Sequence, residues 1–205
     1  MPRTVERPAG GAGIFLREFM RSPMRTGAIL PSSRRLAAAM VEPVSCTGEP
    51  VVVELGPGTG AFTRVIRDRL AGRGRQLAVE LNPLLAERVA GLFPDVEVVN
   101  GDACQLADLL SERGITSVDV VVSGLPWAAF SAELQRSIMA SVGQVLSPHG
   151  AFTTFAYGMA AWTPAGRRMR ALLRDQFDEL VVGRTVSRNV PPAFVYYARR
   201  PRYAV

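Results

Sequence analysis

Between residues 51 and 176, short apolar runs alternate with longer segments in which apolar residues recur every three or four positions. The short runs predict strands at 51–55, 76–80, 96–99, 118–122 and 151–157. The longer segments predict helices at 61–70, from 83 onward, and at 104–113, 131–146 and 164–176. Short strands that alternate with helices of this length indicate a parallel, doubly wound sheet.

The end of the chain breaks this alternation. Two further apolar runs at 179–187 and 193–199 have no helix between them. They predict an antiparallel hairpin with Pro191 and Pro192 in its loop. The predicted fold is therefore α/β: a Rossmann-like, doubly wound, mostly parallel seven-stranded sheet with an antiparallel C-terminal hairpin.

The segment before the first predicted strand also has a helical pattern. Residues 14–21 predict a short amphipathic helix with Phe15 and Phe19 on one face. Arg17 and Arg21 lie on the opposite face. Such a helix can lie flat on a membrane surface or cover the sheet as a lid.

A second short helix is predicted at 34–41, with Ser33 as its N-cap. Pro43 and Gly48 then indicate a linker. We therefore expect an N-terminal helical arm at 1–48 and a main domain at 49–205.

Charge is distributed unevenly along the chain. All 24 basic residues are arginine, and the net charge is +6. Residues 1–40 hold seven arginines and two acids, residues 41–165 eight arginines and thirteen acids, and residues 166–205 nine arginines and three acids. Two basic ends around an acidic centre favour an anionic partner, such as a membrane surface or a nucleic acid, unless the arginines are simply solvated.

Composition excludes several classes of protein. No apolar run approaches the ~20 residues of a membrane span, and the start of the chain lacks the apolar centre of a signal peptide. Cys46 and Cys104 fit no metal-binding spacing, so no metal is expected and both are predicted to be free thiols. These features predict a cytoplasmic protein, with peripheral contact to the inner membrane face left open.

The glycine-rich turn after the first predicted strand is the clearest candidate for a binding site. Gly56, Gly58 and Gly60 follow a strand that ends in Glu54, which is typical of the nucleotide-binding corner of an open sheet. Glu54 would repel the pyrophosphate of a dinucleotide but attract the ammonium and sulfonium of S-adenosylmethionine. The sequence therefore favours a methyltransferase, although Gly56, Gly58 and Ala61 also match a dehydrogenase fingerprint, and a non-catalytic sensor stays open.

Acids also follow the next two predicted strands, at the same edge of the sheet. Glu80, followed by Leu81, is placed to accept hydrogen bonds from ribose hydroxyls. Asp102 is placed to accept from an adenine amine, with the Ala103 backbone completing that contact. Asp102 can also cap the next helix, a second role that does not compete with the first.

The segment after the fourth predicted strand completes the candidate site. Ser123, Leu125 and Trp127 would lie where a methyl group meets its acceptor. Tyr157 ends the fifth predicted strand near the same place, and Trp127 and Tyr157 could each contact an ammonium by cation–π attraction or simply pack in the core. The only histidine, His149, is expected in a turn away from the chemistry.

At these residues the chain resembles the class I S-adenosylmethionine-dependent methyltransferases. The turn at 54–60, Glu80, Asp102 and the segment 123–127 correspond to the first four motifs of that superfamily. The resemblance implies S-adenosylmethionine as cofactor, held by Glu54, the three glycines, Glu80, Leu81, Asp102, Ala103 and Ser123.

Within the superfamily the chain is similar to two related groups, the bacterial phospholipid N-methyltransferases and the ribosomal RNA adenine dimethyltransferases. Residues 15–19 and 26–33 resemble the membrane-contacting helix and cofactor-covering loop of the phospholipid group, and 189–196 resembles its C-terminal signature. The adenine dimethyltransferases place Asn where Ser123 stands, and they carry a further helical domain. An RNA substrate is therefore less favoured, although Trp127 is bulkier than the lipid pattern and leaves another amphiphilic acceptor open.

The expected activity is N-methylation of a phosphatidylethanolamine-like headgroup amine at a membrane surface. A neutral amine needs no strong base, which fits a site without an evident one. Phe15, Phe19, Arg17, Arg21 and Arg25 are expected to contact an anionic membrane.

Overall fold

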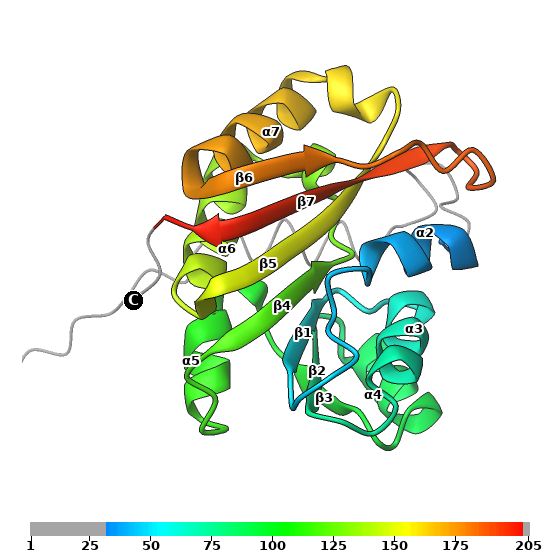
Figure 1. Ribbon diagram of the computed structural model, residues 1–205, viewed down its shortest axis with the longest axis vertical. Helices are drawn as coiled ribbons and strands as arrows, with labels where there is room; N and C mark the ends of the chain where they lie inside the picture. The colour runs from blue at the N-terminus through cyan, green and yellow to red at the C-terminus, as the bar shows by residue number, and fades with distance from the viewer. Residues whose placement is uncertain (1–31, 203–205) are drawn as a thin grey trace, which may run out of the picture.

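A seven-stranded sheet forms the centre of the computed structural model, which describes residues 32–202 (Figure 1). Its strand order is β3-β2-β1-β4-β5-β7-β6. The strands are β1 (Val51–Leu55), β2 (Arg75–Glu80), β3 (Glu97–Asn100), β4 (Val118–Ser123), β5 (Leu146–Tyr157), β6 (Phe177–Val182) and β7 (Ala193–Pro201). Strands β3, β2, β1, β4 and β5 pair in parallel, whereas β7 runs antiparallel to both β5 and β6. The predicted fold class and its C-terminal hairpin are confirmed.

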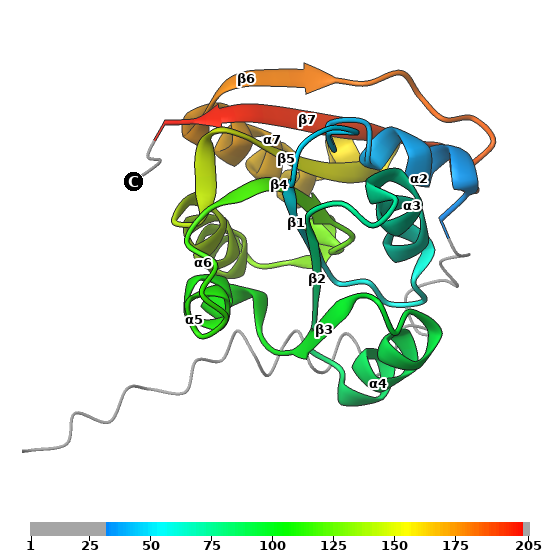
Figure 2. The ribbon, with the colours of Figure 1, turned by 60° about the horizontal axis from the view of Figure 1, so that its bottom comes forward.

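Helices cover both faces of the sheet (Figure 2). They are α2 (Arg34–Met40), α3 (Ala61–Leu70), α4 (Pro83–Leu92), α5 (Leu106–Ser111), α6 (Ala132–Gly143) and α7 (Pro164–Gln176), with single 3-10 turns η2 (Ala103–Gln105), η3 (Trp127–Ala129) and η4 (Ala160–Trp162). Helices α2, α3 and α4 lie on one face, and α5, α6 and α7 lie on the other. Because side chains alternate along a strand, Val52 and Glu54 face the α3 side, while Val53 and Leu55 enter the core beneath α5 and α6.

Side-chain caps begin most of these helices where the sequence predicted. Oxygen atoms of Ser33, Asn82, Ser131 and Thr163 accept hydrogen bonds from backbone N–H groups in the first turns of α2, α4, α6 and α7. Each such bond satisfies a donor that has no partner within the helix. Local chemistry therefore sets these helix starts.

Several boundaries differ from the predicted ones. Helix α6 ends at Gly143 and β5 begins at Leu146, five residues earlier than expected, so that His149 lies in a strand and not in a turn. The pairing of β4 with β5 shifts register between Val118 and Val120, which lets this earlier segment join the sheet. The helix expected at 104–113 is divided into η2 and α5, because Asp102 caps a 3-10 turn first.

Helix α2 is packed against the sheet and not separate from it. Leu36, Ala37 and Met40 are buried in one core cluster with residues of β1 and β7. The carbonyl oxygen of Met40 accepts a hydrogen bond of 2.9 Å from Thr153 Oγ1, and that of Ala39 accepts one of 2.9 Å from Tyr197 Oη. The segment before it, including the helix predicted at 14–21, lies outside the described residues.

None of the helices within residues 32–202 has the length and apolar character needed to cross a bilayer.

From β1 the successive strands are added toward one edge of the sheet, as β2 and β3, and from β4 they are added toward the other edge. Strands β1 and β4 lie side by side where this order switches. In open α/β sheets, ligands bind at the carboxyl ends of the strands beside such a switch point. The glycine turn after β1 and the segment after β4 both lie there.

Candidate active site

The glycine corner joins β1 to α3 through three residues in the left-handed region. Gly56, Gly58 and Gly60 have φ values of 70°, 55° and 82°, which side chains other than glycine's rarely adopt. The Gly56 N–H donates to the carbonyl of Val79 at 2.9 Å, which ties the turn to the end of β2. Gly60 is the N-cap of α3, and no side chain caps that helix.

The space around the three glycines differs. A Cβ atom on Gly56 would lie 2.8 Å from Leu125 Cδ2, and one on Gly60 would lie 2.5 Å from the Phe93 ring. A Cβ atom on Gly58 would meet no atom within 4 Å. A side chain at position 56 or 60 would therefore have to displace Leu125 or Phe93, whereas Gly58 borders open space where a ligand can approach the backbone.

Glu54 is a fully buried carboxyl at the end of β1, beneath this corner. Neither of its oxygens has a hydrogen-bond partner among the described residues. Burial raises the pKa of Glu54 from 4.5 to about 8; the neighbouring Thr63 lowers it in part, and the charge of Glu80 raises it slightly. A buried polar group without a partner costs free energy, so this carboxyl fits a site that receives a cationic ligand.

Glu80 lies beside Glu54 at the end of β2 and is also buried. Its Oε2 accepts a hydrogen bond from Gly58 N at 3.1 Å, and its Oε1 accepts one from Asn82 N at 3.0 Å. Burial raises the pKa of Glu80, and these backbone donors offset part of the rise. The carboxylate therefore supports the glycine corner and keeps lone pairs that can accept from ribose hydroxyls.

The next strand brings Asp102 to the same edge. Asp102 Oδ1 accepts a hydrogen bond of 2.9 Å from Cys104 N, which is the capping role predicted alongside adenine binding. Ala103 is buried, and Leu81 packs against the core. Sequence reasoning missed Asn100, whose Nδ2 donates to the carbonyls of Glu80 and Leu81 at 2.8 and 3.1 Å.

The segment after β4 is held by the side chain of Ser123. Its buried Oγ accepts hydrogen bonds from Trp127 Nε1 at 3.0 Å and from Leu125 N at 3.4 Å. Trp127 is only 3% exposed and packs edge-on against Phe152. Of the two alternatives for Trp127, contact with an ammonium or packing in the core, the structure shows core packing. Leu125, in the same segment, lies against Gly56.

Tyr157 lies at the carboxyl end of β5, on the side of the sheet where α2 packs. Its ring contacts Phe155 edge-on, and partial burial raises the pKa of its hydroxyl. Tyr196, by contrast, is buried in the main core.

Asn189 links the C-terminal loop to the start of α2, a contact that sequence reasoning did not predict. Its Oδ1 accepts a hydrogen bond from Ser33 N at 2.9 Å, and its Nδ2 donates to the Pro191 carbonyl at 2.8 Å. Two segments that are far apart in the sequence therefore meet beside the carboxyl edge of the sheet. The only sequence signal was the occurrence of Asn189 and Ser33 in two separately recognised motifs.

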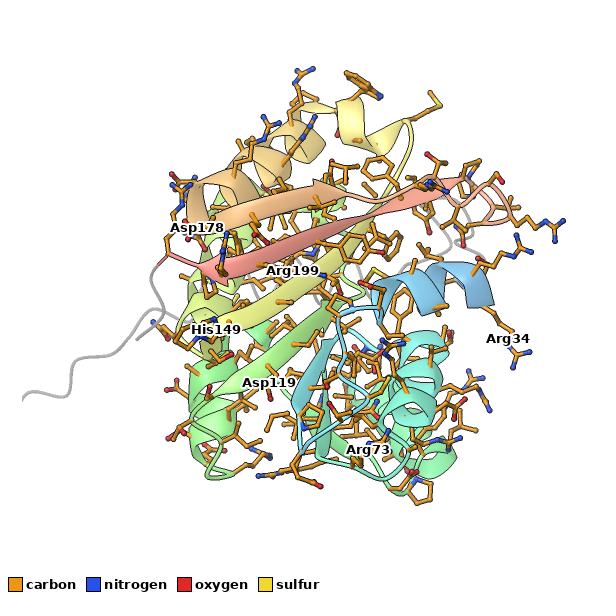
Figure 3. The ribbon with its side chains drawn as sticks, in the orientation of Figure 1. Arg34, Arg73, Asp119, His149, Asp178 and Arg199 are labelled. Atoms are coloured by element: carbon orange, nitrogen blue, oxygen red, sulfur yellow. The ribbon has the colours of Figure 1, made fainter. Side chains whose placement is uncertain are left out.

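A separate cavity lies away from the glycine corner. It has a volume of about 680 Å³ and is lined by residues that include Asp119, His149 and Arg199, near the amino ends of the parallel strands. Figure 3 shows these three residues well to the left of Arg34, which begins α2 near the opposite edge. His149 therefore lies away from the candidate site, as predicted.

Within residues 32–202, no group of three or more His, Cys, Asp and Glu side chains is placed to hold a metal ion. Cys46 and Cys104 are free thiols, as predicted. Burial raises the pKa of the Cys104 thiol to about 11, which keeps it protonated and unreactive.

Known proteins resemble this chain in both sequence and fold. A sequence profile described as a methyltransferase domain matches residues 52–150. Ornithine lipid N-methyltransferase of Singulisphaera acidiphila is 37% identical over 190 residues, which cover 91% of this chain and 94% of that protein. Ribosomal RNA small subunit methyltransferase A of Thermotoga petrophila is 31% identical over 117 residues, 55% of this chain and 41% of that protein.

Among solved structures, Aeropyrum pernix fibrillarin in complex with natively bound S-adenosyl-L-methionine has a similar fold. Its TM-score is 0.59 and its sequence identity 16%, over 80% of this chain and 74% of that chain. The sequence matches decide against the dehydrogenase alternative. The chain belongs to the class I S-adenosylmethionine-dependent methyltransferases and is a relative of the lipid N-methyltransferases.

Proposed function

We propose that this enzyme transfers methyl groups from S-adenosylmethionine to the primary amine of a membrane lipid. The observation that carries the proposal is the 37% identity to an ornithine lipid N-methyltransferase across nearly the whole of both chains. The predicted phosphatidylethanolamine-like headgroup and an ornithine headgroup both present a primary amine. Both are therefore candidate acceptors within the one proposed activity.

The residues at the carboxyl edge of β1, β2 and β3 fit the cofactor. Glu54 places an unpartnered carboxyl beneath the glycine corner, which can ionise when a cationic ligand binds, and Gly58 leaves the backbone open to a ligand. The residues we propose for cofactor binding are Glu54, Gly56, Gly58, Gly60, Glu80, Leu81, Asp102, Ala103 and Ser123. Bound there, S-adenosylmethionine would supply an electrophilic methyl group.

The acceptor amine would then meet the segment formed by Ser123, Leu125 and Trp127, with Tyr157 on its far side. The Ser123 hydroxyl already binds the Trp127 indole, so we propose that it holds the segment in place and transfers no proton. Holding a neutral amine in line with a reactive carbon can supply ~7–11 kcal/mol of the barrier. The amine must lose its proton before attack, and water at the membrane surface can take it.

The N-terminal arm completes the proposal. The division into an arm at 1–48 and a domain at 49–205 stays a prediction. Helix α2, which belongs to the predicted arm, packs on the sheet. Phe15, Phe19, Arg17, Arg21 and Arg25 lie outside the described residues. We propose that they contact the anionic inner face of the membrane, so that the enzyme acts there as a peripheral protein.

The test is transfer of labelled methyl groups to defined acceptors. The full chain is incubated with labelled S-adenosylmethionine and vesicles that contain phosphatidylethanolamine, an ornithine lipid, or phosphatidylcholine alone, and separately with ribosomal RNA. We expect label in one or both of the amine lipids and none in phosphatidylcholine. Label only in RNA or in small polar products would refute the proposed lipid substrate.

A further inference from the structure

Large apolar side chains are exposed together near one part of the carboxyl edge. Met159 is 89% exposed, Trp162 76% and Val190 66%, and Val182 is also exposed. Met159 and Trp162 lie between β5 and α7, Val182 ends β6, and Val190 lies in the loop before β7. Exposed apolar side chains that cluster in this way mark an interaction surface.

The pairing of the strands shows that these segments are neighbours. Tyr157 pairs with Ala193 at the end of the β5–β7 ladder, and Val182 pairs with Tyr196. The Gly158 N–H donates to the Pro192 carbonyl at 3.1 Å, which joins the turn before η4 to the loop before β7. Figure 1 shows both segments at the end of the sheet where β5 ends and β7 begins.

Arginines flank these apolar residues without acids between them. Arg167, Arg184 and Arg188 are exposed, and neither 158–174 nor 183–193 contains an acidic residue. None of the three arginines lies within 4.0 Å of a carboxylate in the part of the chain that the structure describes. Arg167 donates to the Trp162 carbonyl at 3.1 Å, and a groove of about 520 Å³ continues from it along Arg170 and Arg174 of α7.

Exposed apolar side chains flanked by arginines suit the interfacial region of a bilayer, where headgroups meet acyl chains. Tryptophan favours the depth of the lipid headgroups, methionine and valine favour the acyl chains, and arginine favours the phosphates. A surface for RNA would instead offer several aromatic faces for stacking, and Trp162 is the one aromatic ring that is largely exposed among residues 32–202. Charge and apolar character together therefore favour a lipid surface.

We propose that Met159, Trp162, Val182 and Val190, with Arg167, Arg184 and Arg188, form a docking surface for an anionic bilayer. This inference rests on the proposed lipid substrate. Docking here would place the end of β5 and the acceptor side of the site against the lipid layer. A headgroup amine could then enter without the lipid leaving the membrane, and all seven residues of the surface lie in the sequence after β5.

The chain carries its own probe for this contact. It has two tryptophans, of which Trp127 is 3% exposed in the core and Trp162 is 76% exposed. Fluorescence of the full chain is measured with anionic vesicles whose acyl chains are brominated. We expect blue-shifted emission and quenching, and we expect the Trp162→Phe variant, which keeps only the core tryptophan, to show neither.

Variants then test the surface itself by vesicle flotation. Arg184→Gln combined with Arg188→Gln is expected to weaken binding to anionic vesicles by roughly tenfold or more, from the usual effect of a charge near an anionic surface. Met159→Ser combined with Trp162→Ser is expected to weaken it by a similar factor. Leu84→Ser is the matched control, because Leu84 is 74% exposed on α4 at the other end of the strand order, and its binding should not change.

Two outcomes would overturn the inference. Bromolipids that leave Trp162 emission unchanged while the protein floats with the vesicles would show docking by another face, with lipid methylation still possible. Quenching of Trp162 by RNA but not by vesicles would show a different partner. Failure of the proposed function would be seen separately, as the absence of label in lipid amines. For each variant, unchanged binding of S-adenosylhomocysteine shows that the protein is folded.

Discussion

Two buried carboxyls at the ends of neighbouring strands define the candidate site at the scale of residues. Glu80 has backbone donors for both oxygens, whereas Glu54 has none among the described residues. The same side-chain chemistry thus has two different roles. Glu80 builds the corner, and Glu54 supplies a buried carboxyl whose negative charge is favoured only when a cationic ligand lies beside it.

The raised pKa of Glu54 predicts how stability depends on pH. In the cofactor-free protein the folded state holds this proton up to a pKa of about 8, while the unfolded state loses it near 4.5. The folded state therefore binds more protons in this window, and its stability falls as pH rises from 4.5 to 8. The total loss is on the order of a few kcal/mol, and Glu80 contributes with the same sign.

Urea unfolding between pH 5 and pH 9 measures this effect. Glu54→Gln should reduce the slope of stability against pH, because glutamine does not ionise. Glu87→Gln, at an exposed position on α4, is the matched control and should keep the slope. Identical slopes for both variants would contradict a protonated Glu54 in the folded protein.

Removal of the Glu80 carboxylate should weaken cofactor binding. Glu80→Ala removes an acceptor for ribose hydroxyls and leaves Gly58 N and Asn82 N without their partner. Loss of such charge-assisted hydrogen bonds costs about 1–3 kcal/mol, which is roughly a five- to 150-fold loss of affinity. Calorimetry with S-adenosylhomocysteine measures it, and unchanged affinity would remove Glu80 from the site.

At the scale of elements, turns and helix caps fix where the helices around the candidate site begin and in which direction they run. The glycine corner sets the direction of α3, and the Asn189 contact with Ser33 sets where α2 begins. Each of these connections can be tested by one substitution and one matched control.

Gly60→Ala should destabilise the protein more than Gly72→Ala. Both glycines have nearly the same φ, 82° and 81°, so backbone strain is matched. Only at Gly60 would the new Cβ lie 2.5 Å from the Phe93 ring, whereas nothing lies within 4 Å at Gly72. We expect an extra loss of about 1–3 kcal/mol from this clash. Equal free energies of unfolding for the two variants would show that Phe93 moves aside freely.

Asn189→Ala should loosen the contact between the C-terminal loop and α2. The buried amide supplies two hydrogen bonds, to Ser33 N and to the Pro191 carbonyl. Leaving these groups unpaired costs about 1–3 kcal/mol, or roughly 2–12 °C in melting temperature for a domain of this size. Ser187→Ala, at an exposed position of the same loop, should change neither quantity. A melting temperature equal to that of the unsubstituted chain would refute the proposed link.

At the scale of the whole molecule, the two basic ends of the sequence flank an acidic centre that contains the cofactor corner. The docking surface draws its arginines from the C-terminal basic part, close to the end of β5. This distribution of charge favours a cationic cofactor at the acidic glycine corner and an anionic partner at the basic docking surface.

A direct comparison of coenzymes tests this distribution. Calorimetry of the full chain should show binding of S-adenosylhomocysteine and none of NAD, because the Glu54 carboxyl beneath the glycine corner opposes a pyrophosphate there. Binding of NAD in preference to S-adenosylhomocysteine would contradict the cofactor assignment.

By itself, the sequence determined the features that depend on short-range chemistry. Alternating apolar runs define a doubly wound sheet, side-chain caps such as Ser33 and Asn82 start helices, and Glu54, Glu80 and Asp102 fall at strand ends for the same local reasons. Parallel strands then bring their carboxyl ends to one edge, so the residues of the candidate cofactor site could be predicted from the sequence.

Features that depend on burial and on contacts between distant segments became visible in the folded chain. Whether Glu54 finds a partner, whether Trp127 packs in the core or faces a ligand, and whether Asn189 reaches Ser33 are set by which surfaces meet after folding. The exposure of Met159 and Trp162 is of the same kind, because apolar residues before a helix look alike in a sequence whether they are covered or not. Periodicity reports which residues share a face of an element, and only packing decides what lies against that face.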